Sequence, residues 1–335
     1  MKKVKIAQIG TSANSHGNNI WCSIKKQSDI FEVMGYAMPE GEKEKFSERM
    51  ADFAGCPELT VDEILNNPEI EAVAIETEEL YLTQYATLAA QHGKHIHMEK
   101  PGGTSLGAFR ALIELVKNSK TVFHTGYMYR YNPFIRQLME RIKSGELGEI
   151  ISVEAQMNCY HPKEVRQWLE GFPGGMMFYL GCHLIDLILQ IQGKPENIIP
   201  LSKCSGVDNV TGKDFGMAIL EYKNGISFAK TSAVEVGGFA RRQLVVSGTK
   251  GTVEIKPFEM FAEGGQYTAM TEYKSPGNWG DMGNTIQSNV YDRYDDMMAS
   301  FAAMVRGDKE NQWGADYELE LYETVLKACG GELYV

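Results

Sequence analysis

The chain has 335 residues, more than one hydrophobic core usually organises, and this length predicts two domains. Its formal net charge is −11, which argues against nucleic acids and anionic membrane surfaces as partners, because both call for basic patches. No apolar run approaches the roughly 18 residues of a membrane span.

The N-terminal apolar run, Val4–Ile9, is too short for the core of a signal peptide. The six cysteines lie far apart without a Cys-x-x-Cys pair, so neither a zinc-type metal site nor a disulfide framework is expected. We therefore expect free thiols, no metal and a cytoplasmic location.

Strand-like and helix-like segments alternate along the first third of the chain. The predicted strands are Val4–Ile9, Phe31–Ala37, Ala72–Glu76, His95–Met98 and Thr121–Thr125. The predicted helices are Asn18–Lys26, Glu42–Ala54, Val61–Asn66, Leu82–His92 and Leu106–Ser119. This alternation is typical of an α/β fold with a parallel sheet and right-handed crossovers.

The loop after the first strand keeps one glycine of a dinucleotide-binding turn. Gly10 follows the strand, but Ser12 and Ser15 occupy the second and third glycine positions, and Gly17 comes two residues late. Serine is small enough to let a pyrophosphate approach, and its hydroxyl or amide could bind phosphate at a helix N-terminus. The loop fits either a weak cofactor site or an ordinary polar connection.

The second strand would end in an acidic residue if the ribose hydroxyls of NAD were bound there. Glu40 is a displaced candidate for this role, whereas Lys43 and Lys45 would suit the 2′-phosphate of NADP. A solvated, charged helix start explains the same residues. NAD and NADP both stay open, with NAD preferred.

The fourth strand ends in Glu99-Lys100-Pro101-Gly102-Gly103. Proline stops the strand and the glycines allow a sharp turn, so Lys100 is delivered to the carboxyl end of the sheet. Ligands collect at that edge in open α/β sheets, and a desolvated lysine there can exchange protons near neutral pH. The alternative is a surface lysine beside a tight turn.

From about Gly126 the pattern changes to longer strands with few helices between them. A helix at Asn132–Ser144 precedes the predicted strands Glu149–Asn158, Gly216–Tyr222, Ile226–Ala233, Arg242–Ser247 and Gly251–Ile255. Gly264–Asn289 is predicted to be a long loop, and Tyr291–Arg306 and Asp316–Ala328 to be helices. We expect a C-terminal α+β domain with a large, mostly antiparallel sheet that is open on one face. The domains are then 1–125 and 126–335.

An apolar helical pattern begins after Gly174 and Gly175. Its polar residues Tyr179, His183 and Asp186 follow at helical spacing, so they are predicted to share one helix face. A histidine and a tyrosine with a carboxylate one turn away can perform acid–base chemistry. A core histidine bonded to backbone is the alternative.

These two stretches form part of a longer resemblance. Its motifs are Gly93-Lys94-His95 leading into Glu99-Lys100-Pro101, Gly126-Tyr127-Met128-Tyr129-Arg130-Tyr131-Asn132-Pro133, Gly145-Glu146-Leu147-Gly148-Glu149-Ile150, Gly181-Cys182-His183-Leu184-Ile185-Asp186 and Gly248-Thr249-Lys250-Gly251. In order and spacing they resemble the glucose–fructose oxidoreductase, inositol dehydrogenase and rhizopine-catabolism (Gfo/Idh/MocA) family over nearly the whole chain.

The resemblance implies an N-terminal Rossmann domain with a doubly wound parallel sheet that binds NAD or NADP. It implies a C-terminal domain whose sheet forms a homodimer or homotetramer interface. The expected activity is a dehydrogenase or reductase acting on CH–OH groups of a sugar, cyclitol or related polyol. Lys100 and His183 would be the acid/base groups, and the family pattern allows a cis Lys100–Pro101 bond.

The implied binding positions fall into two sets. The cofactor set comprises Gly10, Thr11, Ser12, Asn14, Ser15, Glu40, Glu76, Thr77, Glu99 and Lys100. The substrate set comprises Arg130, Tyr131, Trp168 and Asp186, in which Trp168 offers a flat apolar face to a sugar ring or to nicotinamide.

Two departures from the family pattern leave alternatives open. Tyr179 stands where the family usually has an aspartate, and it could replace that group as proton acceptor or pack as an ordinary aromatic residue. The usual Thr-Pro-x-x-x-His is here Thr77-Glu78-Glu79-Leu80-Tyr81-Leu82, preceded by Glu76. A sugar lyase or hydrolase that uses the dinucleotide without net redox, and a non-catalytic sensor of dinucleotide or sugar, remain alternative functions.

Overall fold

The computed structural model describes residues 2–331 and divides them into two compact units. The first contains residues 2–127 together with Tyr294–Tyr322, and the second contains Met128–Arg293 together with 323–331. The chain therefore passes to the second unit within two residues of the expected boundary, but Tyr294–Tyr322 returns to the first. Residues 332–335 of the expected second domain lie outside the described range.

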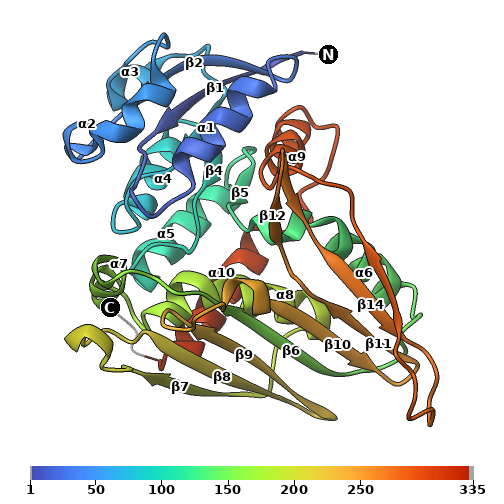
Figure 1. Cartoon of the computed structure of the whole chain (residues 1–335). Helices are drawn as coiled ribbons and strands as arrows, with labels where there is room; N and C mark the ends of the chain where they lie inside the picture. Colours follow the sequence, from blue (N-terminus) through green and yellow to red (C-terminus); the bar gives the residue numbers. More distant parts are fainter. Residues whose placement is uncertain (1, 332–335) are drawn as a thin grey trace. The chain divides into compact units, whose positions relative to one another are not determined.

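The first unit is built on a parallel sheet of five strands in the order β2-β1-β3-β4-β5 (Figure 1). The strands are β1 (Val4–Ile9), β2 (Phe31–Ala37), β3 (Ala72–Ile75), β4 (His95–Met98) and β5 (Phe123–Thr125). Strand order reverses beside β1, so the loops after β1 and β3 lie at the switch point where such sheets bind ligands. The Rossmann-type prediction is confirmed.

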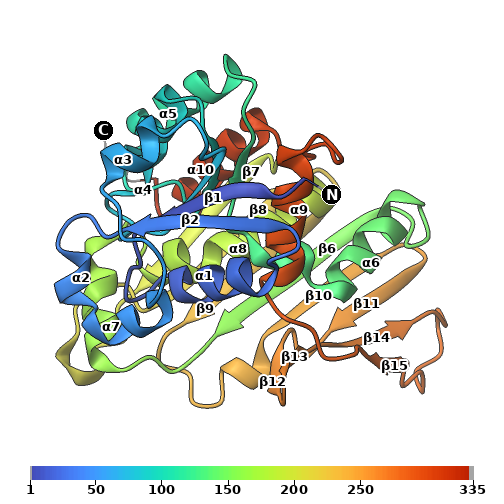
Figure 2. The same cartoon turned by 90° about the horizontal axis from the view of Figure 1, so that it is seen from above.

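Helices cover this sheet. They are α1 (Gly17–Lys26), α2 (Glu42–Lys45), α3 (Val61–Asn66), α4 (Leu82–Gln91), α5 (Leu106–Lys117) and α9 (Asp295–Val305). Figure 2 shows α1 running alongside β1 and β2. The helix α10 (Ala315–Ala328) begins in this unit and ends in the second.

The single helix expected at Glu42–Ala54 is broken. Phe46 leaves the helical conformation after α2, and a 3₁₀ helix, Ser47–Phe53, follows. The reason is packing: the break lets Phe53 stack on Trp21 at 4.7 Å in a buried cluster with Tyr36. Tertiary packing outweighs local helix propensity here.

The second unit is built on a sheet of eight strands in the order β15-β14-β11-β10-β6-β9-β8-β7. The strands are β6 (Ile150–Asn158), β7 (Asn197–Lys203), β8 (Phe215–Tyr222), β9 (Gly225–Ser232), β10 (Gln243–Gly248), β11 (Gly251–Ile255), β14 (Ala269–Tyr273) and β15 (Asn284–Gln287). All neighbouring pairs are antiparallel except β6 with β9, which confirms the predicted sheet.

Two regions of this sheet differ from expectation. The stretch Gly264–Asn289, expected to be a loop, contains β13 (Gly265–Tyr267), β14 and β15, with β13 pairing with β12 (Met260–Ala262). The edge strand β7 was not expected, because Pro200 interrupts its pattern; an edge strand tolerates proline since one side needs no ladder bonds.

Helices α6 (Pro133–Lys143) and α8 (Cys182–Gln192) lie on one face of the sheet (Figure 1). Asn132 caps α6 by accepting from two backbone N–H groups, with Pro133 at the first helical position. A short helix, α7 (Lys163–Trp168), was not expected from the sequence. Within the described residues no helix covers the opposite face of the sheet, as predicted for an open sheet.

Candidate active site

The β1–α1 loop turns sharply at Gly10, which has a φ of +88°. A Cβ atom at this position would lie 2.5 Å from Thr77, so only glycine fits. Hydrogen bonds of the two serines stabilise the loop. The Ser12 N–H donates to the Glu76 carbonyl at 2.9 Å, and Ser15 Oγ donates to the Ser12 carbonyl at 3.2 Å. The loop is therefore held in a fixed shape without the second and third glycines.

A cation that the sequence did not reveal also holds this loop. The guanidinium of Arg49 donates to the Ser12 carbonyl at 2.7 Å and to the Ala13 carbonyl. Arg49 comes from the 3₁₀ helix that breaks the expected Glu42–Ala54 helix. The Asn14 N–H is engaged within the loop, since it donates to Ser12 Oγ at 3.3 Å.

Glu42 is the carboxylate that reaches the loops at the switch point. It is fully buried; its Oε2 accepts from the Thr11 N–H at 2.8 Å and its Oε1 from the Glu78 N–H at 3.1 Å. Burial raises the pKa of Glu42 to about 7, against the lowering effect of these two bonds. Glu40, the residue expected from the sequence, is exposed and accepts a bond from the Tyr85 hydroxyl at 2.7 Å.

Both lysines considered for a 2′-phosphate are engaged in ion pairs. Lys43 lies 2.7 Å from Glu58, and Lys45 lies 3.3 Å from Glu78. They are exposed, and each side-chain hydrogen bond raises the pKa of its lysine.

Strand β4 is followed directly by a buried ion pair between Glu99 and Lys100. Lys100 Nζ lies 3.5 Å from Glu99 Oε1, and both side chains are 2% exposed. Burial raises the pKa of Glu99 to about 7, and the Lys100 ammonium opposes this shift. The Lys100–Pro101 bond is cis, as the resemblance allowed. Thr77, also in the expected cofactor set, is fully buried beside Gly10.

In the second unit, two glycines open the segment that carries Tyr179 and His183. Gly174 and Gly175 have φ values of +66° and +52°, and a Cβ on Gly175 would lie 2.3 Å from the Lys213 carbonyl oxygen. They lead into a π-helical turn, Met177–Gly181, followed by α8. π-turns are rare and are frequent at functional sites.

Tyr179 lies within the π-turn, and His183 follows it in α8. The Tyr179 ring packs edge-on against Trp168 at 5.1 Å and lies 6.1 Å from the His161 ring. The His183 ring packs edge-on against Tyr129 at 4.9 Å. Tyr179 and His183 therefore each pack against an aromatic ring, Tyr179 against Trp168 and His183 against Tyr129.

Asp186 forms a buried ion pair with Arg130. Arg130 Nε donates to Oδ2 at 3.0 Å and its Nη2 to Oδ1 at 2.8 Å, while Gln190 donates to Oδ2 at 2.9 Å. Such a two-bond pair fixes geometry well. It links the 3₁₀ turn Met128–Tyr131, which includes the buried Tyr131, to α8.

A second buried network of polar side chains lies beside His183, and the sequence analysis did not predict it. The Tyr129 hydroxyl donates to Glu259, which also pairs with Arg242 at 2.7 Å and with Arg293. Burial raises the pKa of Tyr129 well above its ordinary value, and the Glu259 carboxylate adds to this shift. These residues are scattered in the sequence and carry no motif, so only the fold brings them together.

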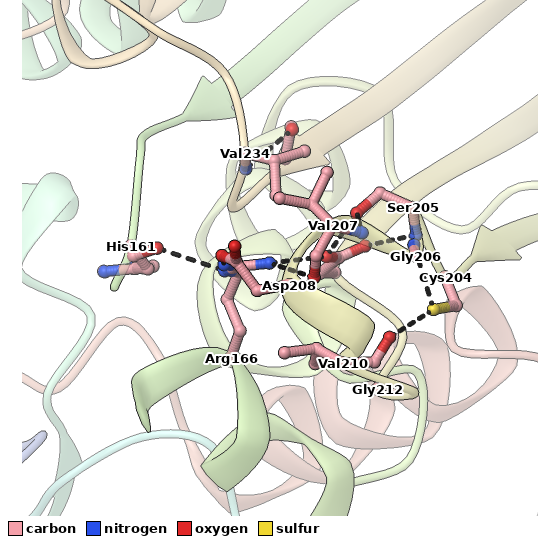
Figure 3. A network of polar contacts seen from close by, with 12 residues as sticks. His161, Arg166, Cys204, Ser205, Gly206, Val207, Asp208, Val210, Gly212 and Val234 are labelled. Carbon is pink, nitrogen blue, oxygen red and sulfur yellow. Dashed lines mark hydrogen bonds and ion pairs between the residues drawn. The ribbon is translucent and has the colours of Figure 1, made fainter. Parts of the chain in front are cut away.

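Figure 3 shows how Arg166, on α7, holds the loop between β7 and β8. Its fully buried guanidinium donates to the carbonyls of His161 at 3.2 Å and Val207 at 2.9 Å, and it pairs with Asp208. Arg166 thereby fixes the backbone of His161, one of the rings beside Tyr179. Burial lowers the pKa of His161 to about 4, and the nearby Arg242 charge adds to this shift, so its ring is neutral at pH 7.

Residues 2–331 contain neither a candidate metal site nor a candidate membrane-spanning helix. No group of three or more His, Cys, Asp or Glu side chains in this range could hold a metal ion. No helix in the same range is long and apolar enough to cross a membrane.

Family models match both units. Residues 4–127 match an oxidoreductase family with an NAD-binding Rossmann fold, and residues 135–254 match the GFO/IDH/MocA C-terminal domain. The chain belongs to the Gfo/Idh/MocA oxidoreductase family. This confirms the resemblance expected from the sequence motifs.

Individual Gfo/Idh/MocA relatives are distant. An uncharacterized oxidoreductase of Escherichia coli, YhhX, is 34% identical over 140 residues, covering 41% of this chain and 40% of that protein. The NADP-dependent scyllo-inositol 2-dehydrogenase of Bacillus subtilis is 25% identical over 180 residues, covering 53% and 48%. The match to these two curated relatives thus spans about half of their length or less.

A solved structure supports the fold over the whole chain. The UDP-N-acetylglucosamine 3-dehydrogenase of Acidithiobacillus ferrooxidans superposes with a TM-score of 0.78, covering 98% of this chain and 97% of that one at 18% identity. At this identity the likeness concerns the Gfo/Idh/MocA fold alone.

Proposed function

We propose that this Gfo/Idh/MocA protein transfers hydride between a nicotinamide dinucleotide and a hydroxyl-bearing carbon of a sugar, cyclitol or related polyol. The observation that carries the proposal is the buried Lys100–Glu99 ion pair at the carboxyl edge of the parallel sheet. The family to which this Rossmann unit belongs binds NAD at that fold. The inositol dehydrogenase among the relatives supports a cyclic polyol as the substrate class.

When bound, the nicotinamide supplies the hydride acceptor or donor. The protein must then move the hydroxyl proton, and Lys100 and His183 are the groups proposed for that work. Lys100 is fixed by the turn at Pro101 and by Glu99. Tyr179 is proposed as an auxiliary acid/base or substrate-orienting hydroxyl.

The substrate contacts proposed here are aromatic. Trp168, Tyr179 and His161 are half-buried rings, and such rings can pack against the apolar face of a sugar while their polar edges bond hydroxyls. Arg130 and Asp186 are satisfied by each other. We therefore assign them a positioning role, in which they hold α8, and with it His183, against the turn that carries Tyr129 and Tyr131.

NAD is the proposed cofactor in preference to NADP. The donor and acceptor set fits a dinucleotide: Arg49 supplies positive charge at the β1–α1 loop, where Rossmann proteins bind the pyrophosphate, and Glu42 follows β2, where an acidic residue binds the adenine ribose. A carboxylate accepts bonds from ribose hydroxyls and repels a 2′-phosphate. The ion pairs of Lys43 and Lys45 point to the same preference.

Titration of the purified protein with NADH and NADPH, after removal of carried-over nucleotide, tests this proposal. NADH is expected to bind at least about tenfold more tightly, a difference of about 1.4 kcal/mol. Glu42→Gln is expected to reduce that ratio, and the exposed Glu44→Gln on the same helix to leave it unchanged.

If neither dinucleotide binds, the dehydrogenase proposal fails. If NADPH binds more tightly than NADH, only the assignment of Glu42 fails. The two outcomes separate the proposed activity from the proposed cofactor preference.

We also propose a homodimer or homotetramer formed through the open face of the large sheet. The alternating strands β8 and β9 place Met217, Ile219, Ile226 and Phe228 on this face, where Ile226 is 60% exposed. An apolar patch of this kind on a sheet without covering helices is typical of a protein interface.

A further inference from the structure

A row of buried polar side chains crosses the first unit beneath its ligand-binding edge. The parallel pairings align Gln8 on β1, Ala74 on β3, His97 on β4 and His124 on β5, so these side chains share one face of the sheet. Glu76 lies two residues beyond Ala74 and therefore extends the row on the same face. Such a row is unusual in a parallel sheet, whose strands are normally apolar on both faces.

Glu76 is the member of this row without a clear partner. Its side chain is 0% exposed, and neither carboxyl oxygen has a hydrogen-bond partner among residues 2–331. Glu76 Oε1 lies 3.5 Å from His97 Nε2, and His97 Nδ1 lies 2.8 Å from His124 Nδ1. Burial lowers the pKa of His97 to about 3, so that ring is neutral at pH 7 and does not offer a cation to Glu76.

The groups around Glu76 contain more carboxyls than cations. The titratable groups that face it are Glu99 and Lys100 after β4, Glu79 after β3, Glu42 on α2, and His97 and His124 on β4 and β5. Lys100 forms an ion pair with Glu99 at 3.5 Å. Burial raises the pKa of Glu76 well above its ordinary value; the Glu99 carboxylate adds to this effect and Lys100 opposes it.

A bare carboxylate in this position would be costly, because a buried charge needs a partner or hydrogen bonds. The neutral acid avoids that cost. The Glu76 backbone contacts the β1–α1 loop, since its carbonyl accepts from the Ser12 N–H at 2.9 Å. The nicotinamide ring carries a positive charge when oxidised and none when reduced, and a nearby positive charge favours an ionised carboxylate.

We propose that Glu76 is a redox-linked proton site, which holds a proton in the cofactor-free protein and with reduced dinucleotide and releases it when oxidised dinucleotide binds. The step is the ionisation of the Glu76 carboxylic acid to carboxylate and a free proton, with no change in the cofactor's bonds. The inference rests on the proposed function, because it requires a nicotinamide at this edge.

One consequence distinguishes the two cofactor forms. Below the pKa of Glu76, the affinity for NAD⁺ rises with pH by up to about tenfold per pH unit, because binding and proton release are linked. The affinity for NADH does not follow this trend. NAD⁺ and NADH differ only at the nicotinamide ring, in its charge and in the hydrogen added at C4, so the comparison confines the difference to that ring.

Proton release on binding is measured by calorimetry at pH 7 in buffers of different ionisation enthalpy. Wild-type protein is expected to release a fraction approaching one proton per NAD⁺ bound and none with NADH. Glu76→Gln is expected to bind NAD⁺ without release. Glu79→Gln, which removes a neighbouring buried carboxyl, is the matched control and is expected to keep the release.

Equal release with NAD⁺ and NADH, or unchanged release in Glu76→Gln, overturns the inference. An infrared measurement on cofactor-free protein separates it from the proposed function: wild type is expected to show a protonated-carboxyl band at pH 7 that Glu76→Gln lacks. Absence of that band difference overturns the protonated Glu76 even where both dinucleotides bind. Failure of both dinucleotides to bind overturns the proposed function and the redox linkage together.

Discussion

At the residue scale, the first unit concentrates buried carboxyl groups whose pKa values are raised by burial. Glu42, Glu79 and Glu99 all have raised pKa values, and burial is the largest cause for each. Nothing in the acidic pair Glu78-Glu79 distinguishes a buried carboxyl from an exposed one. Only the fold shows that Glu79 is 2% exposed.

Glu79 makes stability depend on pH in a defined direction. Burial raises its pKa to about 8, so between about 4.5 and 8 the unfolded chain has lost a proton that the folded protein keeps. The stability of the wild type therefore falls as pH rises through this window. Glu79→Gln lacks this loss and is expected to be more stable than wild type by about 1–3 kcal/mol at pH 8, with little advantage at pH 4.5.

Urea unfolding at pH 4.5 and pH 8 measures this difference. Glu44→Gln removes the same formal charge from an exposed position and serves as the control. An advantage of Glu79→Gln that is equal at both pH values would contradict the buried-acid interpretation.

At the element scale, helices and strands can be predicted from the sequence where hydrophobic periodicity and turn residues agree. The five parallel strands, the Lys100–Pro101 turn and the long strands β6, β8, β9, β10 and β11 were found this way. The π-turn Met177–Gly181 was missed because one extra residue in a helix leaves no compositional signal. The broken Glu42–Ala54 helix was missed because Phe53 packing, not propensity, decides it.

The residues of the candidate site also fall into a group that can be predicted from the sequence and a group that cannot. Lys100, Glu99 and Gly10 could be found because each lies at a turn with its own residue signature. Glu42, Arg49 and the Tyr129–Glu259 network could not, because they depend on tertiary contacts between residues without a motif.

The turn before the π-helix depends on Gly175. Its φ of +52° and the Lys213 carbonyl, 2.3 Å from a would-be Cβ, both oppose a side chain. Gly175→Ala is therefore expected to destabilise the protein by about 2–4 kcal/mol. Gly171→Ala is the control, since nothing lies within 4 Å of its would-be Cβ, and it is expected to change stability by less than about 0.5 kcal/mol. Equal denaturation midpoints for the two variants would contradict this account of the turn.

At the scale of the whole molecule, the open face of the large sheet governs assembly. Ile226→Glu places a charge on this face without disturbing the buried face of β9. Sedimentation velocity is expected to show an oligomer for wild type and a shift towards monomer for Ile226→Glu, with the far-ultraviolet circular dichroism unchanged. A monomeric wild type would contradict the proposed interface.

The central claim is hydride transfer that depends on Lys100 and His183, and an activity assay tests it most directly. Wild type, Lys100→Met and His183→Asn are each incubated with saturating NAD⁺ and a panel of cyclic polyols and sugars, and NADH formation is followed by absorbance. Wild type is expected to turn over at least one polyol, and each variant is expected to lose about 100-fold or more of that activity, with dinucleotide affinity retained in His183→Asn. No turnover by wild type on any member of the panel, or full turnover in both variants, would contradict it.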